Sequence, residues 1–289
     1  MANEQMNIQW YPGHMTKTRR QIEADLKQVD AVCEIVDARI PISSRNPDID
    51  SICGTKPRIV VLNRMDLADS EATKRWIAYY KSKGMAAIAT DCKSRKGIAD
   101  FQPAARSVLK EKLERDAARG MNRPIRVMIV GIPNVGKSTL INQISGRKGA
   151  KAENRPGVTR GKQWVTVDSG LLLLDTPGIL WPKFEDPRVG MMLAYTGAVK
   201  ENIIDTEELA CHLMELLHRY YPQVLKERYK IDSDSLLPGY ELLEKAGRKR
   251  GYLLARGEIH TERMAKVLLD EYRSGKLGHF TLEAPEELL

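Results

Sequence analysis

Over the first two-thirds of the chain, short runs of branched apolar residues alternate with longer segments in which apolar residues recur every three or four positions. Runs of the first kind are typical of strands buried on both faces, and segments of the second kind predict helices that cover a sheet. The alternation therefore predicts an α/β fold with a largely parallel sheet and helices on both faces. Strands are expected over 31–36, 58–62, 86–90, 125–130, 164–168 and 171–174, and helices over 16–28, 71–82, 99–115 and 138–144.

Beyond about residue 200 the pattern changes to helical spacing alone. Leucines at this spacing form one apolar stripe around Leu213, and a second stripe surrounds Leu268. Such stripes are far more often core than ligand sites. We therefore expect two domains, an α/β domain with a basic N-terminal segment over 1–200 and an all-helical domain over 201–289.

The loop between the expected strand 125–130 and the helix that follows carries the first candidate chemistry. Its sequence, Gly131-Ile-Pro-Asn-Val-Gly-Lys-Ser138, matches the phosphate-binding pattern G-x-x-x-x-G-K-[ST], with a chance glycine turn as the alternative. Glycines let several N–H groups point inward, and the helix N-terminus adds partial positive charge. Lys137 would reach the β- and γ-phosphates as a catalytic residue, and the Ser138 hydroxyl would ligate Mg²⁺. Further nucleotide contacts are expected from Asn134, Val135, Gly136 and Thr139.

A second motif, Asn63-Arg-Met-Asp66, lies at the end of an expected strand and is similar to the base-reading N-K-x-D motif of GTPases. An aspartate there accepts hydrogen bonds from N1–H and the 2-amino group of guanine, and adenine offers neither donor. Asn63 can tie this loop to the P-loop, and the alkyl stem of Arg64, in place of the usual lysine, can cover the base. Backbone contacts to the guanine edge are expected from the later loop that contains Asp91 and Cys92.

Two further segments are placed to hold a metal ion and the γ-phosphate. Asp175-Thr-Pro-Gly178 follows an apolar strand, where Asp175 would hold Mg²⁺ through water and the Gly178 N–H would meet the γ-phosphate. Thr159 lies in a polar, glycine-bearing loop and is expected to ligate Mg²⁺ when GTP is present. An ordinary loop threonine is the alternative for that residue.

The base-reading motif precedes the P-loop, whereas it follows the P-loop in ordinary small GTPases. The same sheet can be built if the chain is cut after the second metal-site region and its old ends are joined. This order resembles that of the circularly permuted GTPases of bacterial ribosome assembly, and the resemblance covers essentially the whole chain. It rests also on the segments Trp10-Tyr-Pro-Gly-His-Met15, Asp37-Ala-Arg-Ile-Pro41 and Asp175-Thr-Pro-Gly-Ile-Leu-Trp-Pro182.

The resemblance implies a circularly permuted, Ras-like P-loop GTPase sheet with an all-α C-terminal domain that binds RNA or the ribosome. It implies a cytoplasmic GTP hydrolase that binds GTP, GDP and Mg²⁺, is activated by a late precursor of the large ribosomal subunit (rRNA and ribosomal proteins), and uses hydrolysis to time maturation and its own release. We expect a monomer. A GTP-gated RNA-binding placement factor with incidental hydrolysis is the alternative, and an ATP-using enzyme is disfavoured by Asp66.

Comparison with related GTPases bears on three residues, Ile179, His14 and Asn134. Ile179 stands where Ras-like enzymes carry a water-orienting glutamine, so intrinsic hydrolysis should be slow. His14 is implied to orient the water once the particle is bound; a histidine that only packs against or caps the next helix is the alternative. Asn134 would coordinate K⁺ as in related GTPases, unless it is there only because the turn favours asparagine.

The charge distribution agrees with a polyanionic partner. The formal net charge of +8 divides into +6 over 1–123, +6 over 124–200 and −4 over 201–289. A basic field of this kind favours nucleic acid, although a merely soluble basic protein is the alternative. A local basic cluster, Arg248-Lys-Arg250, lies beside Tyr252 in the acidic C-terminal part. No apolar run approaches a membrane span, and the four cysteines are far apart, as in a protein with reduced thiols.

Overall fold

The computed structural model describes residues 20, 22–146, 163–167, 170–178, 186–199, 205–232 and 236–288. Its contacts divide the chain into two compact units. The nucleotide-binding unit holds the described residues up to 178 and also 283–288, and the helical unit holds those from 186 to 282. This division differs from the expected boundary after residue 200 in two ways. Helix α7 (Pro187–Tyr195) packs with the later helices and belongs to the helical unit, and the C-terminal residues 283–288 belong to the nucleotide-binding unit.

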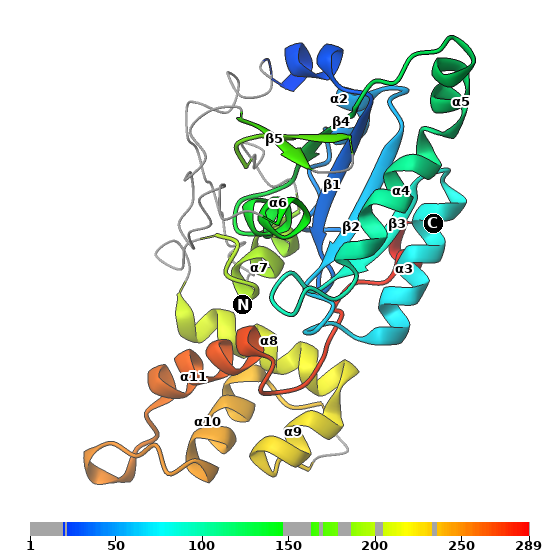
Figure 1. Cartoon of the computed structure of the whole chain (residues 1–289). Coiled ribbons are helices and arrows are strands. Elements are labelled where there is room, and N and C mark those ends of the chain that lie inside the picture. Colours follow the sequence, from blue (N-terminus) through cyan, green and yellow to red (C-terminus); the bar gives the residue numbers. More distant parts are fainter. Residues whose placement is uncertain are drawn as a thin grey trace. The chain divides into compact units, whose positions relative to one another are not determined.

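A six-stranded sheet forms the centre of the nucleotide-binding unit (Figure 1). The strand order is β3-β2-β1-β4-β6-β5, and all neighbours are parallel except β5 and β6, which form the expected hairpin. The strands are β1 (Ala31–Asp37), β2 (Arg58–Asn63), β3 (Ala86–Thr90), β4 (Ile125–Val130), β5 (Gln163–Val167) and β6 (Leu171–Asp175). All six were expected, and every residue of β1 and β2 is buried, which explains why their sequences are mostly apolar.

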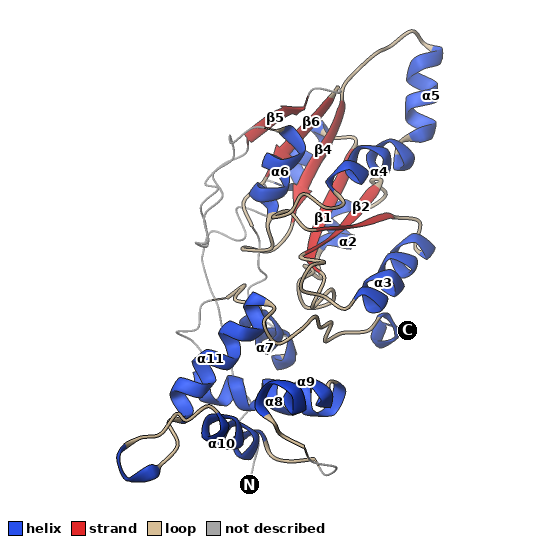
Figure 2. Cartoon of the chain, turned by 60° about the horizontal axis from the view of Figure 1, so that its bottom comes forward, coloured by secondary structure: helices blue, strands red, loops and turns tan. Residues whose placement is uncertain are grey.

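Helices cover both faces of this sheet, as expected for the fold class (Figures 1 and 2). On one face, α2 (Ile49–Cys53) and α3 (Ser70–Ser82) contribute to cores that contain Val32 and Val36. On the other face lie α4 (Phe101–Val108) and α6 (Lys137–Ser145). Of the helix expected over 16–28, residues before 20 lie outside the described ranges, and the described part ends in η1 (Leu26–Gln28).

The single helix expected over 99–115 is wrong. The structure has instead η2 (Ile98–Asp100), α4 and a separate α5 (Lys110–Ala118), with a break at Leu109, whose ψ of 10° is not helical. The break lies where burial ends. Leu109 is the last residue of this segment that is buried in the core, and α5 buries none of its side chains. In a permuted chain the old ends are joined between α4 and β4, so α5, which lies in this join, is an exposed helix rather than part of the packed layer.

The helical unit is built around α8 (Thr206–Tyr220), which packs against α10 (Gly239–Lys249) and α11 (Thr261–Ser274). Both expected apolar stripes face this core, and Leu213 and Leu268 are fully buried. The shorter α9 (Pro222–Tyr229) follows α8 directly. Across the described ranges, no helix is both long and apolar enough to cross a membrane.

Candidate nucleotide-binding site

The loops that carry the candidate residues meet at one edge of the sheet. Strands β1, β2, β3, β4 and β6 are mutually parallel, so the segments that follow them all emerge at their carboxyl ends. In open α/β sheets this edge is where ligands bind. The P-loop follows β4 in the middle of the sheet, the base-reading motif follows β2, and Asp175 closes β6.

The P-loop adopts a backbone that depends on its glycines. Gly131 and Gly136 have φ angles of 155° and 106°, which L side chains rarely adopt. A Cβ at Gly131 would lie 2.7 Å from the carbonyl oxygen of Ile35, so the loop also needs glycine for its close approach to β1. Helix α6 begins at Lys137, and Ser138 and Thr139 occupy its first turn, where backbone N–H groups can bind an anion.

Lys137 lies folded beneath this loop. Its ammonium donates to the carbonyl oxygens of Gly131 at 3.1 Å and Ile132 at 2.8 Å, and the residue is only 7% exposed. Burial lowers the pKa of Lys137 to about 8, and the Asp175 carboxylate acts in the opposite direction. A nearby polyphosphate would favour the charged form of this buried ammonium and raise its pKa.

The segment after β6 approaches the same lysine. A Cβ at Gly178 would lie 2.8 Å from Lys137 Nζ and 2.9 Å from the Pro133 nitrogen, so only glycine fits there. Asp175 is 2% exposed, and the next residue, Thr176, donates from its hydroxyl to the carbonyl oxygen of Ile129 at 2.7 Å. Lys137, Asp175 and Gly178 are therefore brought together, as a site for a metal-bound triphosphate requires.

The base-reading motif is joined to the P-loop by two hydrogen bonds. Asn63 Nδ2 donates to the carbonyl oxygen of Val135 at 2.8 Å, which is the link that the sequence predicted. Arg64 donates to the carbonyl oxygen of Asn134 at 2.7 Å, a contact that the sequence did not predict. Arg64 and Asn134 both have positive φ angles, 61° and 60°, so this hydrogen bond joins two residues in left-handed conformations.

This backbone geometry bears on Asn134. Asparagine is one of the few side chains that tolerate φ near 60°, so the turn itself accounts for its presence. The K⁺ ligand role stays a prediction beside that explanation.

Two supporting elements were missed at the level of sequence. Thr90 is fully buried at the end of β3, and its hydroxyl donates to Asn63 Oδ1 at 3.1 Å, which fixes the amide so that Nδ2 faces Val135. Asp37 and Arg39 form a buried two-pronged ion pair with contacts of 2.9 and 2.8 Å, and Arg64 approaches Asp37 at 3.6 Å. Burial acts to raise the pKa of Asp37, but the two guanidinium groups outweigh it and the pKa is lowered.

The remaining residues expected at the base lie in two adjacent turns. Asp66 is half-buried in the turn after Arg64, where the Met65 N–H donates to the carbonyl oxygen of Thr90 at 3.1 Å. Asp91 accepts from the Lys93 N–H at 2.8 Å and thereby shapes its own loop. Burial raises the pKa of the neighbouring Cys92 thiol to about 11, so this thiol stays protonated. The carboxylate of Asp91 serves the loop, so any contact to a base from here would come from the backbone.

Three residues of the expected site cannot be placed. His14, Thr159 and Ile179 lie outside the described residues.

The basic cluster of the helical unit differs from expectation. Arg250 donates to Glu271 at 2.9 Å, and Glu271 also accepts from Arg228 and from the Tyr229 hydroxyl at 2.7 Å. Arg263 rather than the cluster lies over the Tyr252 ring, at 4.4 Å from its centroid. Arg250 therefore stabilises the fold, which leaves Arg248 and Lys249 as the outward-facing charges of the cluster.

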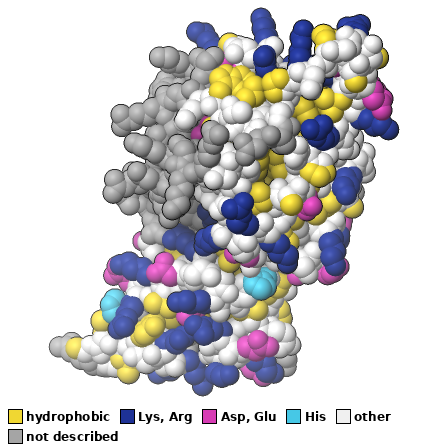
Figure 3. Space-filling model, viewed as in Figure 1, with side chains coloured by type: hydrophobic (Ala, Val, Ile, Leu, Met, Phe, Trp, Pro, Cys, Tyr) yellow, Lys and Arg dark blue, Asp and Glu magenta, His cyan; other side chains and the backbone are white. Residues whose placement is uncertain are grey.

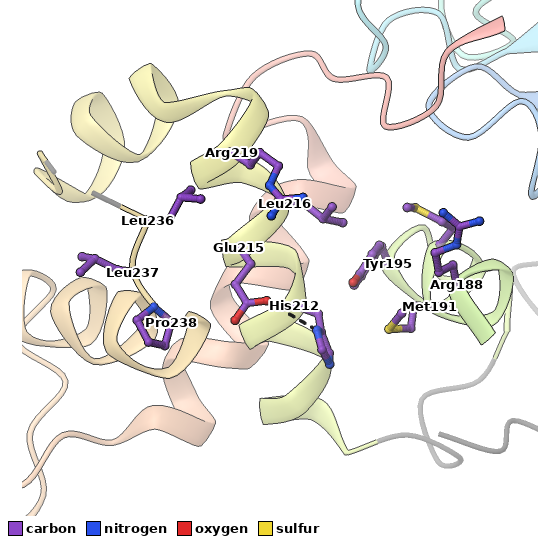
Figure 4. Close-up of a pocket in the computed structure, with 11 residues that line it drawn as sticks. Arg188, Met191, Tyr195, His212, Glu215, Leu216, Arg219, Leu236, Leu237 and Pro238 are labelled. Carbon is purple, nitrogen blue, oxygen red and sulfur yellow. Dashed lines mark ion pairs between the residues drawn. The ribbon is translucent and has the colours of Figure 1, made fainter. Parts of the chain in front are cut away.

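A separate cavity of about 390 Å³ lies within the helical unit, between α7, α8 and residues 236–238 (Figure 4). Its walls are largely apolar, with Met191, Leu216 and Leu236 among them. His212 and Glu215 approach each other at 3.8 Å across one turn of α8 at its edge. The cavity contains none of the residues expected to contact a nucleotide, and we assign it no part in the chemistry.

Comparison with known proteins shows what the whole chain is similar to. A sequence family described as "50S ribosome-binding GTPase" matches residues 126–241. Ribosome biogenesis GTPase A of Bacillus cereus is 48% identical over 285 residues, which span 98% of this chain and 95% of that protein. The GDP-bound structure of TM YlqF is similar with a TM-score of 0.62 and 31% identity, covering 92% of this chain and 100% of that one. The GNP-bound YlqF from T. maritima gives a TM-score of 0.60 and 30% identity, with coverages of 93% and 99%.

Proposed function

This chain belongs to the ribosome biogenesis GTPase A family, and on that premise we propose that it binds a late precursor of the large ribosomal subunit, is activated by it, and uses GTP hydrolysis to time maturation and its own release. At the coarser level, the chain is a P-loop GTP hydrolase of ribosome assembly. The proposed place of action is the cytoplasm, and the proposed form is a monomer.

The observation that carries the proposal is the pair of hydrogen bonds between the base-reading motif and the P-loop. The bonds from Asn63 to Val135 and from Arg64 to Asn134 join the loop that would read guanine to the loop that would hold its phosphates. A single nucleotide could then be gripped at both ends, with Asp66 accepting from the guanine edge. An adenine would leave that carboxylate without its two donors, which supports selection of GTP over ATP.

The chain's own residues divide the work on the phosphates. Lys137 would exchange its two carbonyl partners for phosphate oxygens, and the first-turn N–H groups of α6 would hold the phosphate chain. Ser138, Thr159 and Asp175 would hold Mg²⁺, which when bound neutralises charge on the β- and γ-phosphates. The Gly178 N–H would donate to the γ-phosphate when GTP is bound. Glycine is needed there because a Cβ would lie too close to Lys137.

Activation by the particle needs a group that orients water. We propose His14 for this role, since Ile179 can neither donate nor accept a hydrogen bond and an imidazole on a glycine-containing segment can be swung into place. Asn134 is the proposed K⁺ ligand, and the cation would supply positive charge at the transferred phosphate. Equal turnover in K⁺ and Na⁺ buffers would exclude the cation.

The charge pattern supports rRNA as the main polyanion. Lys and Arg side chains spread over the face of the molecule seen in Figure 3, in both units. The net positive charge belongs to residues 1–200, so the strongest RNA contacts should come from there, with Arg248 and Lys249 as a local contact in the acidic C-terminal part. Raising salt should therefore weaken particle binding steeply, with a slope that reports the phosphate contacts.

Sedimentation of precursor particles with the protein tests the timing role. The protein should co-sediment in the presence of a non-hydrolysable GTP analogue and be released with GDP, because the γ-phosphate holds the segments around Thr159 and Gly178. Equal retention with the two nucleotides would refute the proposal that hydrolysis drives release.

A further inference from the structure

The last residues of the chain form part of the nucleotide-binding unit although they follow the helical unit in sequence. Residues 285–288 form η5 (Pro285–Leu288), which packs against α3 near the C-terminus marked in Figure 2. Trp76 of α3 is fully buried, and its indole N–H donates to the carbonyl oxygen of Glu283 at 3.0 Å. We call Glu283–Leu288 the C-terminal clamp.

The carboxylate of Glu283 accepts several hydrogen bonds from the loop after β1. Its carboxylate accepts from the Ile42 N–H at 2.6 Å, from the Ser43 N–H at 3.0 Å and from the Ser43 hydroxyl. The residue is only 6% exposed. A buried carboxylate that receives several N–H and O–H donors holds them in a fixed geometry, because losing it would leave those donors without partners.

The loop that Glu283 holds is linked to the base-reading motif through Ser44 and Asp37. Ser44, next to Ser43, accepts from the Asp37 N–H at 2.9 Å and donates to the carbonyl oxygen of Ile40 at 2.6 Å. Asp37 in turn faces Arg64, which donates to Asn134 in the P-loop. A continuous set of contacts therefore runs from the C-terminal clamp to both halves of the nucleotide site.

The clamp also reaches that motif from the other side. Helix α3, against which η5 packs, begins at Ser70, only four residues after Asp66, and Asp69 caps it by accepting from the Ala72 N–H at 2.7 Å. The loop after β1 and helix α3 are thus both held by the C-terminal clamp, the loop through Glu283 and the helix through η5 and Trp76, and α3 follows Asn63–Asp66 closely in sequence. Neither Glu283 nor η5 carries a residue of the expected nucleotide site, so their effect would be on the position of that site.

We propose that the C-terminal clamp preorganises the guanine-binding loop, with Glu283 as a positioning residue that sets the affinity for guanine nucleotides. The proposal rests on the proposed function in one respect, the assignment of Asn63–Asp66 to the base. Loss of the Glu283 carboxylate lets the loop after β1 and Arg64 move, so the protein must reorder them on binding. Affinity for GTP and GDP falls together, because both nucleotides use the guanine-binding loop. Turnover of bound GTP changes little, because Lys137 and Gly178 take no part in these contacts and a bound nucleotide holds Arg64 and Asn134 in place once the loop is reordered.

Glu283→Gln in the full chain tests this proposal, because the glutamine amide has the same shape but has one acceptor oxygen instead of two and no negative charge, so it cannot accept from every donor of Ile42 and Ser43. Glu286→Gln is the matched control, since Glu286 is an exposed carboxylate in the same segment. Dissociation constants for fluorescent GTP, GDP and ATP analogues and single-turnover hydrolysis are measured for each, with thermal unfolding as the check on folding. We expect Glu283→Gln to weaken GTP and GDP binding about tenfold with single-turnover hydrolysis within about twofold of wild type, and Glu286→Gln to match wild type.

Equal GTP affinities for folded Glu283→Gln and wild type would overturn the proposal, as would an unchanged affinity accompanied by a loss of hydrolysis. If wild type shows no preference for GTP over ATP, the assignment of Asn63–Asp66 fails, which is a different outcome from failure of the clamp. If Glu283→Gln does not fold, Ser43→Ala removes one donor and keeps the loop. That variant should weaken GTP binding in the same direction by about threefold, and no change would overturn the proposal.

Discussion

Replacing Asn63 by alanine should disconnect the guanine-binding loop from the P-loop. Asn63 is 3% exposed, and its amide donates to the Val135 carbonyl and accepts from the Thr90 hydroxyl. Alanine can make neither bond, so the buried Thr90 hydroxyl and the Val135 carbonyl both lose their contact with Asn63.

The size of the effect follows from those two bonds. The Thr90 hydroxyl can rotate toward another acceptor, whereas the Val135 carbonyl is fixed by the P-loop backbone. Leaving one buried carbonyl without its donor costs about 1–3 kcal/mol. Without nucleotide the two loops can separate and let water reach this carbonyl, whereas a bound nucleotide holds them together, so the cost falls on the bound state. Taking about 2 kcal/mol, the affinity for GTP should fall about 30-fold, and GDP should follow because both nucleotides use the same base contacts.

Titration with a fluorescent GTP analogue measures this change directly. Thr90→Ser is the matched control, since serine keeps the hydroxyl that donates to Asn63, and it should bind GTP within about threefold of wild type. Asn63→Ala with wild-type affinity for both nucleotides, in a protein that still unfolds cooperatively, would refute the view that these hydrogen bonds assemble the site.

Three further outcomes follow from the structure. Because the pKa of Lys137 is about 8 before phosphate binds and phosphate favours its charged form, GTP binding should take up a proton above pH 8 and weaken as pH rises further, which calorimetry in buffers of different ionisation enthalpy measures. Gly178→Ala places a Cβ 2.8 Å from Lys137 Nζ, so GTP hydrolysis should fall at least about tenfold while GDP affinity changes little; equal losses for both would count against a γ-phosphate contact. Glu271→Gln should lower the unfolding free energy of the helical unit by about 2 kcal/mol at pH 7 in urea titrations. The hydrogen bonds and charges of Arg228, Tyr229 and Arg250 outweigh burial and hold the pKa of Glu271 below its ordinary value, so this difference should shrink as pH falls through that pKa.

The strands were predictable because their signal is local. The centre of β2, Ile59–Leu62, is apolar throughout since the strand is buried on both faces, and the structure places β2 within one residue of the expected range. The P-loop was predictable for a similar reason, because Gly131 and Gly136 are required by the backbone conformation of the loop itself. The break at Leu109 was not, since it depends on where the core ends rather than on a helix-breaking residue.

Contacts between distant segments were recovered only where a known motif pointed to them. The bond from Asn63 to the P-loop was expected from the motif, whereas the bond from Arg64 to Asn134 depends on two left-handed residues meeting in space. Glu283 meets Ser43 across 240 positions, and no local pattern marks either residue. The pairing of Arg250 with Glu271 likewise turns an apparent RNA-binding charge into part of the fold.

GTP turnover by wild type and His14→Ala, each with and without large-subunit precursor particles, tests the central claim most directly. We predict that particles accelerate wild type many-fold, and that His14→Ala binds GTP normally but is not accelerated. Equal acceleration of both proteins would remove His14 from the mechanism and leave the particle-activated GTPase in place. A wild type that binds the particles with no change in turnover would contradict the account and favour a GTP-gated RNA-binding factor instead.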